Sequence, residues 1–556
     1  MKFLRSIVNR AGFILLCLST FCCAVHENSI LSLTESYNEP RNIGFSALFG
    51  GSSHYNWVLV ILNELKNRGH NVSFIAKNDG IRCAKLFPEI NTISLGPDLE
   101  FEDKNLVFTA LEERTSDIKM KLEIGTAIKN SWSKDYPALL DFIKSYNIDL
   151  MLCDHFSEAC VDASRKIGIP FIVTSVLEMT QESDAPYVNV LGMTVDDFST
   201  EHQSIYKRFK DYFIEPFEII SAFQGLFNDI VALKRSFGVD TSLNPSEAWG
   251  DSIKLVNSFF GLAAPRPLGA LVEQVGPIIP RYHPTLTEDL RYYLNSHRKT
   301  VYVSFGQHAT PSRNTIRLLL TSLLENLESG DIDGIIWAVV NSQKYFPDYV
   351  TTSSNTTYSI RDLLDGKHPS IRFDKWIPQI ALLLHPSTHI FVSHGGYGSC
   401  IESMYAGVRM VVVPSFADQF GNAMSIQRAN LGVSMRLPVS LKKLTNEIKR
   451  VASDEDGEIK KSLKRMQAIV QIRSRNGPKI GADVVEEVLF SHANGKIPHR
   501  YAASRRLSFI RAHNIDLYFI LATIVSSIII FTGYAVISFK GYIVSKYGQE
   551  KKKKTM

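Results

Sequence analysis

Cysteine is scarce in this 556-residue sequence, and its charges nearly balance. Four of the seven cysteines lie beyond residue 24, and the spacing of Cys83, Cys153, Cys160 and Cys400 fits neither a disulfide scaffold nor a zinc site. The formal net charge is only +5, and lysines 551–554 supply much of it, so nothing indicates nucleic-acid binding. The remaining composition is that of an ordinary globular protein. Function must therefore be sought in motifs.

Two apolar runs at the ends of the chain indicate a membrane protein. The first begins at Ala11 and ends in the small residues Cys22-Cys23-Ala24, after a basic start, so we expect a secretory signal peptide at residues 1–24. The second, Leu517 to Phe539, holds 23 residues without a charge, and ~20 suffice for a helix to cross a bilayer. Lysines follow it. We therefore expect a transmembrane helix at 517–539, a cytosolic basic tail at 540–556 and a lumenal body.

Short motifs near this tail and in the body indicate the compartment. The last four residues, Lys553-Lys-Thr-Met556, resemble the dilysine address of endoplasmic-reticulum membrane proteins, and a basic patch on anionic lipid is the alternative. Asn71-Val-Ser73 and Asn355-Thr-Thr357 are N-glycosylation sequons compatible with a lumenal chain. We expect a single-pass type I protein of the endoplasmic-reticulum membrane.

The chain length predicts two substantial domains, at about 150 residues per domain as a prior. An apolar strand at Ile43 to Phe49, a helix at about 56–68 and a strand at Val72 to Ala76 form a β-α-β unit, and a comparable pattern recurs in the carboxyl half. We therefore expect an α/β fold with two Rossmann-like domains. The expected boundaries are 25–262 for the first domain, 263–282 for a Pro- and Gly-rich linker, 283–491 for the second domain and 492–516 for a membrane-proximal segment.

The most informative stretch of the sequence runs from Trp376 to Gln419. A strand at His389 to Ser393 leads through a glycine corner into a helix at Gly398 to Ala406, and this arrangement forms an anion site. Another strand at Val411 to Val413 precedes Asp418. Parallel strands place these corners at one edge of the sheet, where open α/β folds bind nucleotides.

The polar and aromatic side chains of this stretch fit a nucleotide-sugar. The indole of Trp376 can stack on a base, the amide of Gln379 can read its edge, and the carboxylate of Glu402 can reach a sugar diol. Three residues of the stretch also have structural alternatives: Trp376 in packing, His394 in the core and Asp418 as a helix N-cap.

Together these residues resemble the signature of the UDP-glycosyltransferases, at Trp376-x-x-Gln379, His394-x-Gly396, Glu402 and Asp418-Gln419. The resemblance implies two domains facing a cleft (GT-B fold). It also implies that Trp376 stacks uracil, Gln379 contacts uridine, Glu402 holds the ribose, His394 touches the diphosphate, and Asp418 and Gln419 bind the sugar. The expected donor-binding residues are Gly306, Gln307, Trp376, Gln379, His394, Gly396, Gly398, Ser399, Glu402, Asp418 and Gln419.

The resemblance also bears on catalysis, which needs a base for the acceptor hydroxyl. His54, expected in the loop after the first strand, and Asp154, at the end of a later strand, align with the catalytic His and Asp of the family. An imidazole with a pKa near 6.5 can take a proton, and a carboxylate on its other nitrogen supports the cation. His54 as a helix-start residue and Asp154 as an N-cap are the alternatives, and His155 could compete for the aspartate.

The leaving diphosphate is expected to be stabilised by the helix N-terminus at Gly396 and by His394, without a metal or other cofactor. Two Asp-x-Asp triplets, Asp331-Ile-Asp333 and Asp454-Glu-Asp456, could hold a divalent ion, but they lie outside the signature and are predicted to be solvated turns. Direct displacement by the acceptor predicts inversion at the anomeric carbon.

Three positions depart from the family pattern: Gln307, Ala338 and Gly398. Each removes or alters a polar contact to the donor. The stretch at about 190–237 is helical and aromatic and is most often core, although it could line an acceptor pocket or contact the membrane. We expect transfer of a hexose, glucose in our interpretation, from a UDP-sugar to a lipophilic hydroxyl acceptor at the membrane. A non-catalytic membrane relative and a UDP-sugar epimerase are the alternatives.

Overall fold

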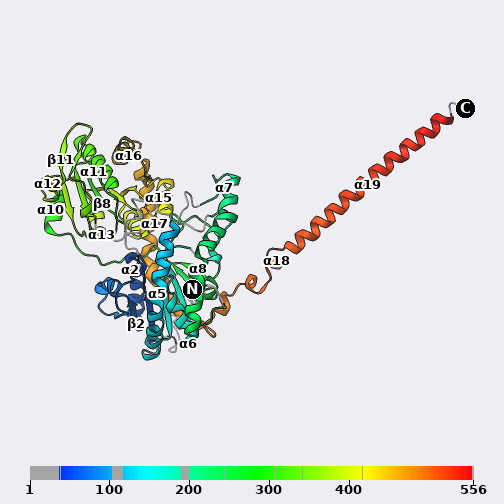
Figure 1. Ribbon diagram of the computed structural model, residues 1–556, viewed down its shortest axis with the longest axis horizontal. Helices are drawn as coiled ribbons and strands as arrows, with labels where there is room; N and C mark the ends of the chain where they lie inside the picture. Colours follow the sequence, from blue (N-terminus) through cyan, green and yellow to red (C-terminus); the bar gives the residue numbers. More distant parts are fainter. Residues whose placement is uncertain are drawn as a thin grey trace, which may run out of the picture.

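The protein forms a body of two helix-covered sheets, from which one long helix projects (Figure 1). The computed structural model describes residues 37, 39–102, 117–178, 180–188, 199–242, 245–306, 309–340, 342–415 and 418–553. The expected signal peptide, Gln307 and the end of the dilysine-like tail from Lys554 lie outside the described residues.

The first sheet has seven parallel strands in the order β3-β2-β1-β4-β5-β6-β7. Its central strand β1 is buried from Ile43 onward, because helices cover both faces. The direction of winding reverses between β1 and β4, and the carboxyl ends of these two strands form the edge where such sheets bind ligands. The strands are β1 (Asn42–Ala47), β2 (Asn71–Ala76), β3 (Asn91–Ser94), β4 (Leu150–Asp154), β5 (Phe171–Ser175), β6 (Ile253–Val256) and β7 (Val272–Gln274).

The second sheet has six parallel strands in the order β12-β9-β8-β13-β14-β15. Its winding reverses between β8 and β13, so it repeats the architecture of the first. The strands are β8 (Thr300–Ser304), β9 (Gly334–Ala338), β12 (Ile371–Asp374), β13 (Thr388–Ser393), β14 (Arg409–Val412) and β15 (Gly432–Ser434), and a separate antiparallel hairpin joins β10 (Tyr349–Thr351) to β11 (Thr357–Ser359).

Amphipathic helices cover these sheets. In α11, for example, Ile316, Leu319, Leu320 and Leu323 are fully buried at helical spacing, while Arg317 lies outside the buried set. The main helices are α2 (Ser52–Asn67), α5 (Asp117–Ser145), α6 (Glu158–Ile167), α10 (Glu288–Ser296), α11 (Arg313–Glu328), α13 (Gln379–Leu383), α14 (Tyr397–Ala406), α15 (Gln419–Arg428), α16 (Leu441–Ser453) and α17 (Glu458–Ser491). The two Rossmann-like domains expected from the sequence are confirmed.

The segment expected to be a linker, 263–282, is more structured than its composition indicates. Its residues Val272–Gln274 form β7, which extends the first sheet by pairing with β6. This part of the expected linker therefore packs with the first domain, because the apolar Leu271 and Val272 are buried.

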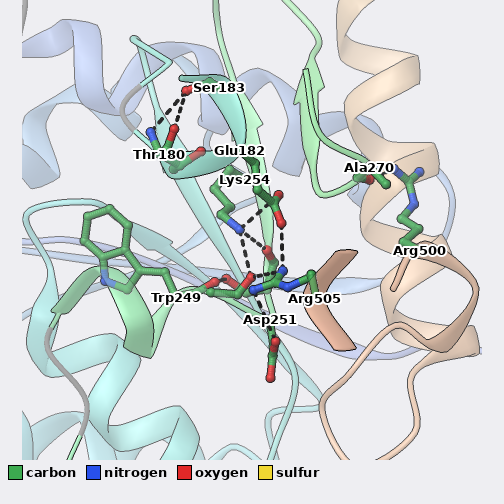
Figure 2. Close-up of polar contacts among 11 residues, drawn as sticks. Thr180, Glu182, Ser183, Trp249, Asp251, Lys254, Ala270, Arg500 and Arg505 are labelled. Atoms are coloured by element: carbon green, nitrogen blue, oxygen red, sulfur yellow. Dashed lines mark hydrogen bonds and ion pairs between the residues drawn. The ribbon is translucent and has the colours of Figure 1, made fainter. Parts of the chain in front are cut away.

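The chain returns to the first domain after the second sheet is complete. Helix α17 packs against α2, and Arg68 binds both Asp483 (2.7 Å) and Glu486 (2.6 Å). The following segment carries Arg505, which binds Glu182 at 2.7 Å and the backbone oxygen of Gly250 at 2.6 Å (Figure 2). The expected membrane-proximal segment is therefore held on the first domain.

The cysteine spacing predicted no disulfide framework, yet the structure pairs Cys153 with Cys160. Cys153 lies near the end of β4 and Cys160 in the first turn of α6, and the strand-to-helix corner brings their Cα atoms to 5.7 Å. This distance lies within the normal range for a disulfide. The correction arises because the turn, and not the separation in sequence, determines which cysteines meet.

Two helical regions remain outside the packed core. The aromatic stretch forms α7 (Ile205–Phe209), a π-helical turn η4 (Lys210–Ile214) and α8 (Glu215–Ser236), and most of its aromatic side chains are exposed, so the interpretation as core is wrong. Helix α19 (Ile515–Lys553) contains the one candidate membrane span found among the described residues, Ile515–Gln549. This helix continues through most of the expected tail.

Candidate active site

His54 and Asp154 lie within hydrogen-bond distance of each other at the carboxyl edge of the first sheet. His54 Nδ1 is 2.9 Å from Asp154 Oδ2, although 100 residues separate them in the sequence. Asp154 ends β4 as predicted. His54 does not lie in a loop as expected but in the first turn of α2, because the chain leaves β1 through Gly50 (φ 107°) and the helix already begins at Ser52.

The electrostatics of this pair favour an ionised carboxylate beside a basic imidazole. Burial alone would raise the pKa of Asp154, but the adjacent His54 and His155 lower it well below its usual range. Burial alone would lower the pKa of His54, but the Coulomb interaction and hydrogen bond with Asp154 raise it overall. The imidazole can therefore accept a proton while its side chain is only 12% exposed.

His155 shares the same carboxylate oxygen, as the sequence indicated. Its Nδ1 is 3.6 Å from Asp154 Oδ2, longer than the 2.9 Å from His54, and the two imidazole rings stack with centroids 5.2 Å apart. The ligand atoms of His54, Asp154 and His155 lie within 4.8 Å of one another, so this group could also hold a metal ion. The shorter hydrogen bond identifies His54 as the principal partner.

The glycine corner of the second sheet forms as the sequence predicts. Strand β13 ends at Ser393, and α14 begins after Gly396, so the backbone N–H groups of the first helical turn point into the corner, and that of Tyr397 donates to the Asp418 carboxylate. The ring of His394 fills the corner: a Cβ on Gly306 would lie 2.9 Å from its Cε1, and one on Gly396 would lie 2.4 Å from its Nε2. Both glycines therefore make room for the imidazole.

The two domains bring their site residues together. A Cβ on Gly398, in the first turn of α14, would lie 3.8 Å from the Cβ of Ser53, in the first turn of α2. Asp418 of the second domain also raises the pKa of His54 in the first. Two helix N-termini, a histidine and a carboxylate from opposite domains thus lie close together where the domains face each other.

Gln379 and Glu402 form the polar centre of the second domain's site. Gln379 donates from Nε2 to Glu402 Oε2 at 2.6 Å and to Ser399 Oγ at 3.2 Å, and the hydroxyl of Tyr302 donates to Gln379 Oε1 at 3.2 Å. Burial raises the pKa of Glu402 to about 7, although the bond from Gln379 opposes this shift. The carboxylate is therefore poorly solvated and suited to hydroxyl donors.

Asp418 is held in place by a residue that the sequence reasoning missed. Asn422 is buried and donates from Nδ2 to Asp418 Oδ2 (2.8 Å) and to the backbone oxygen of Gly395 (2.9 Å), which ties the carboxylate of Asp418 to the glycine corner. Burial raises the pKa of Asp418. The i, i+4 spacing of Asp418 and Asn422 was the available signal. Tyr302 was also missed, since a tyrosine inside a strand is normally core.

The remaining expected donor residues occupy varied environments. Trp376 follows β12 and is 63% exposed, which leaves an indole face open to a ligand. Gln419 is buried, and its Oε1 accepts hydrogen bonds from the backbone N–H and hydroxyl of Ser415 at 3.0 and 2.6 Å. Ala338, which is one of the three departures from the family pattern and not an expected donor residue, ends β9 beside the fully buried Trp337.

The Asp-x-Asp triplets make structural contacts. Asp333 accepts the backbone N–H groups of Arg298 and Lys299, both at 2.7 Å. Asp454 is buried and binds Arg409 at 3.1 Å, so the prediction of a solvated turn is wrong there. Its carboxylate also accepts two backbone N–H groups at the start of α17, which explains its burial.

The chain matches a known family and curated relatives over most of its length. The family model described as "UDP-glucoronosyl and UDP-glucosyl transferase" matches residues 207–550. A UDP-glycosyltransferase of Talaromyces amestolkiae is 28% identical over 488 residues, covering 83% of this chain and 91% of that protein. UDP-glucuronosyltransferase 3A2 of Mus musculus is 24% identical and covers 69% of this chain and 73% of its own.

A solved structure shares the architecture at low sequence identity. The glycotransferase of kitacinnamycin superimposes with a TM-score of 0.58 at 18% identity, over 80% of this chain and 98% of its own. Two Rossmann-like domains closing on a shared cleft are thus the GT-B fold. Together with the matched family model, this identifies the chain as a member of the UDP-glycosyltransferase family and as an enzyme that uses a UDP-sugar.

Proposed function

We propose that this enzyme transfers a hexosyl group, glucose in the first instance, from a UDP-sugar to a hydroxyl of a lipophilic acceptor, with inversion and without a metal ion. The observation that carries the proposal is the His54–Asp154 pair, which faces Asp418 and the glycine corner across the cleft. Acid–base and anion-binding groups from opposite domains then flank one reacting sugar.

The proton chemistry follows from the hydrogen bond between the two catalytic residues. Because Nδ1 of His54 is bound to Asp154, Nε2 is the nitrogen that accepts the acceptor's hydroxyl proton. The acceptor oxygen forms a bond to the anomeric carbon while the bond from that carbon to the diphosphate oxygen breaks, and the electron pair leaves with UDP. Attack opposite the leaving group inverts the anomeric centre.

The donor-site roles rest on the contacts of the second domain. In our proposal Trp376 stacks on uracil, and Glu402, oriented by Gln379, accepts the ribose hydroxyls. His394 and the first turn of α14 stabilise the departing diphosphate. Asp418 and Gln419 bind the sugar, and Asn422 fixes the position of Asp418.

A lipophilic acceptor is supported by the aromatic residues next to His54. The ring of Phe156 lies 5.4 Å from the imidazole of His54, and Phe49 lies 5.3 Å from Phe156 at the end of β1. A structural relative, a UDP-glucosyltransferase from Polygonum tinctorium, is described as capable of glucosylating indoxyl; it is 18% identical, with a TM-score of 0.54, over 82% of this chain and 99% of its own. An aromatic alcohol is therefore a suitable first acceptor.

We further propose that α19 anchors the enzyme in the endoplasmic-reticulum membrane, with both domains lumenal. The helix is long and apolar enough to span a bilayer, and the Cys153–Cys160 disulfide fits an oxidising compartment. The lysines of the expected cytosolic tail agree with this orientation.

The test compares His54→Ala with His202→Ala, a change at a histidine whose side chain is 74% exposed. UDP-glucose turnover with an aromatic alcohol should fall at least ~100-fold in His54→Ala, the scale of general-base catalysis, while UDP affinity stays within about twofold. His202→Ala should match wild type. Equal turnover in His54→Ala and wild type would overturn the catalytic assignment.

A non-catalytic, nucleotide-sugar-binding role is the second candidate, and Gly398 favours it because a glycine there supplies no side chain to the phosphates. Under this alternative the protein binds UDP-sugars but forms no glycoside with any acceptor. A screen of UDP-sugars against a lipid extract, with products identified by mass spectrometry, separates the two roles. An epimerase would change the donor sugar with no acceptor present.

A further inference from the structure

The carboxylate of Asp154 is shared by two histidines, and the proposed proton transfer uses only one of them. Its Oδ2 lies 2.9 Å from His54 Nδ1 and 3.6 Å from His155 Nδ1, and the ligand atoms of the three residues all lie within 4.8 Å of one another. We call these three residues the His–Asp–His group. The second imidazole gives this group a binding capacity that glycosyl transfer does not need.

The spacing of the His–Asp–His group fits a tetrahedral zinc ion. Zinc holds imidazole nitrogens and carboxylate oxygens at about 2.0–2.2 Å, which places two of its ligand atoms about 3.3–3.6 Å apart. The two distances from Asp154 Oδ2 to the imidazole nitrogens, 2.9 and 3.6 Å, bracket most of this range. Two imidazoles on one such ion have ring centroids about 5 Å apart. Those of His54 and His155 lie 5.2 Å apart, so an ion can enter with small side-chain shifts.

Outer contacts hold the group in place. Oδ1 of Asp154 accepts the backbone N–H of Phe156 at 3.0 Å, which leaves Oδ2 directed at the imidazoles. The ring of His54 packs against Gly50, where a Cβ would lie 2.4 Å from the imidazole Cδ2. The ring of Phe156 lies 4.2 Å from that of His155. Contacts of this kind orient metal ligands and raise their affinity, so the group is preorganised.

The ligand types determine which ions fit. Two imidazoles and one carboxylate suit zinc and the neighbouring transition metals, whereas magnesium and calcium prefer oxygen ligands. The side chains of His54, Asp154 and His155 are only 12%, 2% and 6% exposed, so little water competes for them. Nδ1 of His155 also lies 3.4 Å from the backbone oxygen of Thr174, a long contact that an ion would replace. A water molecule would complete the tetrahedron.

Metal binding would remove the catalytic base. The hydrogen bond to the ionised Asp154 places the proton of neutral His54 on Nδ1 and leaves Nε2 free to accept a proton. An ion that takes the lone pair of Nδ1 requires this proton to shift to Nε2. That nitrogen then becomes a donor and cannot accept the hydroxyl proton of the acceptor. The ion also neutralises Asp154, which can no longer support an imidazolium.

We propose that the His–Asp–His group is a zinc site through which the ion reversibly inhibits glycosyl transfer. The ion binds Nδ1 of His54, Oδ2 of Asp154 and Nδ1 of His155, and the metal-free enzyme is the active form. The inhibition rests on the proposed function, in which His54 is the base, whereas the binding of the ion does not depend on it. The two are therefore tested separately.

The binding test uses Co²⁺ as a coloured substitute for Zn²⁺. The full chain without a histidine tag, in detergent micelles, is stripped of metal and titrated without nucleotide, because a diphosphate would itself bind the ion. Co²⁺ in a four-coordinate site absorbs visible light far more strongly than the aqueous ion. Wild type should develop this absorption, and Zn²⁺ should abolish it. The absence of the absorption, or a thiolate charge-transfer band from Cys83 or Cys400, would overturn the site.

A pair of variants assigns the ion to the group. His155→Phe removes one ligand but keeps an aromatic ring beside Phe156, and the affinity for Co²⁺ should fall at least ~100-fold, since even an outer contact is worth 10- to 100-fold. His202→Phe, at a histidine that is 74% exposed, is the matched control and should bind Co²⁺ as wild type does. UDP affinity equal to that of wild type establishes that both variants are folded. Equal Co²⁺ affinity in His155→Phe and wild type would overturn the proposal.

The activity test measures UDP-glucose turnover with an aromatic alcohol at buffered free Zn²⁺, and each protein is compared with its own metal-free rate. Wild type and His202→Phe should lose at least ~100-fold when the site is filled, the scale of general-base catalysis, and recover on chelation. His155→Phe should need at least ~100-fold more Zn²⁺. Mg²⁺ at the same concentrations should not inhibit.

The remaining outcomes separate this inference from the proposed function. Equal Zn²⁺ sensitivity in His155→Phe and wild type would show that the ion acts elsewhere, for example on the donor diphosphate, and would overturn the inference while leaving His54 as the base. Full turnover in His54→Ala, with the Co²⁺ absorption of wild type present, would overturn the base assignment and with it the inhibition. Activation of wild type by Zn²⁺ would overturn both the inhibition and the metal-independent mechanism.

Discussion

The two sides of the cleft are assembled in different ways. On the second domain, most contacts that shape the site join residues of one stretch of under 50 residues: Gln379 binds Glu402, and Asn422 binds Asp418. Only the hydroxyl of Tyr302 reaches Gln379 from an earlier strand. On the first domain, His54 meets Asp154 across 100 residues. The proposed donor site is thus concentrated in one dense motif, whereas the proposed catalytic pair depends on the register of two separate strands.

The electrostatics of the two sides also differ. Asp154, next to two imidazoles, has a pKa well below the usual range, whereas burial raises the pKa of Glu402 to about 7 and that of Asp418 as well. A carboxylate that stays ionised suits proton chemistry at a histidine. Carboxylates that are poorly solvated gain most from the hydroxyls of a ribose or sugar. In the proposed mechanism, therefore, the first domain supplies the acid–base chemistry and the second binds the donor.

The largest expected effect is a loss of catalysis with donor binding unchanged. In Asp154→Asn the partner of His54 loses its charge, so the imidazolium formed during transfer is no longer stabilised, and kcat should fall roughly 10²- to 10⁴-fold. The affinity for UDP-glucose should stay within about twofold, measured by calorimetry. Asp162→Asn controls for the loss of a buried charge. Asp162 is buried outside the candidate site, and its Oδ2 accepts a hydrogen bond of 3.0 Å from Trp132 Nε1. A loss of donor affinity in Asp154→Asn would contradict the division between the domains.

The next largest effect is expected on donor binding. Gly396→Ala adds a Cβ that would lie 2.4 Å from His394 Nε2 and forces the imidazole out of the glycine corner. Because the φ of Gly396 is −59°, alanine can adopt this backbone conformation, and the only obstacle is the steric clash of its Cβ with the imidazole. UDP affinity should fall at least ~10-fold, since displacements near 1 Å disrupt a preorganised site. Gly398→Ala is the matched control, because its Cβ would have no neighbour nearer than 3.8 Å.

Glu402 gives a smaller effect, on stability. Its pKa in the folded protein is about 7, above the ordinary 4.5, so the folded state holds the proton more tightly. The stabilisation is complete below pH 4.5 and is lost as the pH rises through 7. Glu402→Gln should therefore be more stable than wild type at pH 8, by about 1–2 kcal/mol in denaturant unfolding, and nearly equal at pH 5. Glu100→Gln, at an exposed glutamate, should show no such difference. Equal stability of Glu402→Gln and wild type at pH 8 would contradict burial as the cause of the shift.

The sequence predicted those features correctly that depend on residues close together in the chain. The strand, glycine corner and helix around His394 were predictable because the turn residues lie beside the strand that they end. Asn422 and Tyr302 were missed, because their roles depend on which side chain lies opposite them after folding. The same reason explains the Cys153–Cys160 disulfide and the buried Asp454.

The outward orientation of α7 and α8 could not be predicted for a related reason. Helical spacing shows that Phe209, Phe213 and Phe217 share a face, but only packing decides whether that face turns inward. In the structure α5 occupies the opposite side of α8, which leaves these rings exposed. The packing of α5 on α8, and not the helical periodicity, therefore determines that this face is exposed.

The smallest expected effect is a gain in donor affinity. A Cβ at Gly398 meets only Ser53, at 3.8 Å, so Gly398→Asn can add an amide at the first turn of α14 without displacing the glycine corner. One more hydrogen bond to the diphosphate should tighten UDP-glucose about two- to fivefold, on the scale of ~0.5–1 kcal/mol, with kcat unchanged. Gly398→Ala should leave the affinity at the wild-type value. If the asparagine instead weakens binding, the first turns of α2 and α14 must close more tightly around the donor than they do here, and Gly398 would then be a requirement of closure rather than a lost contact.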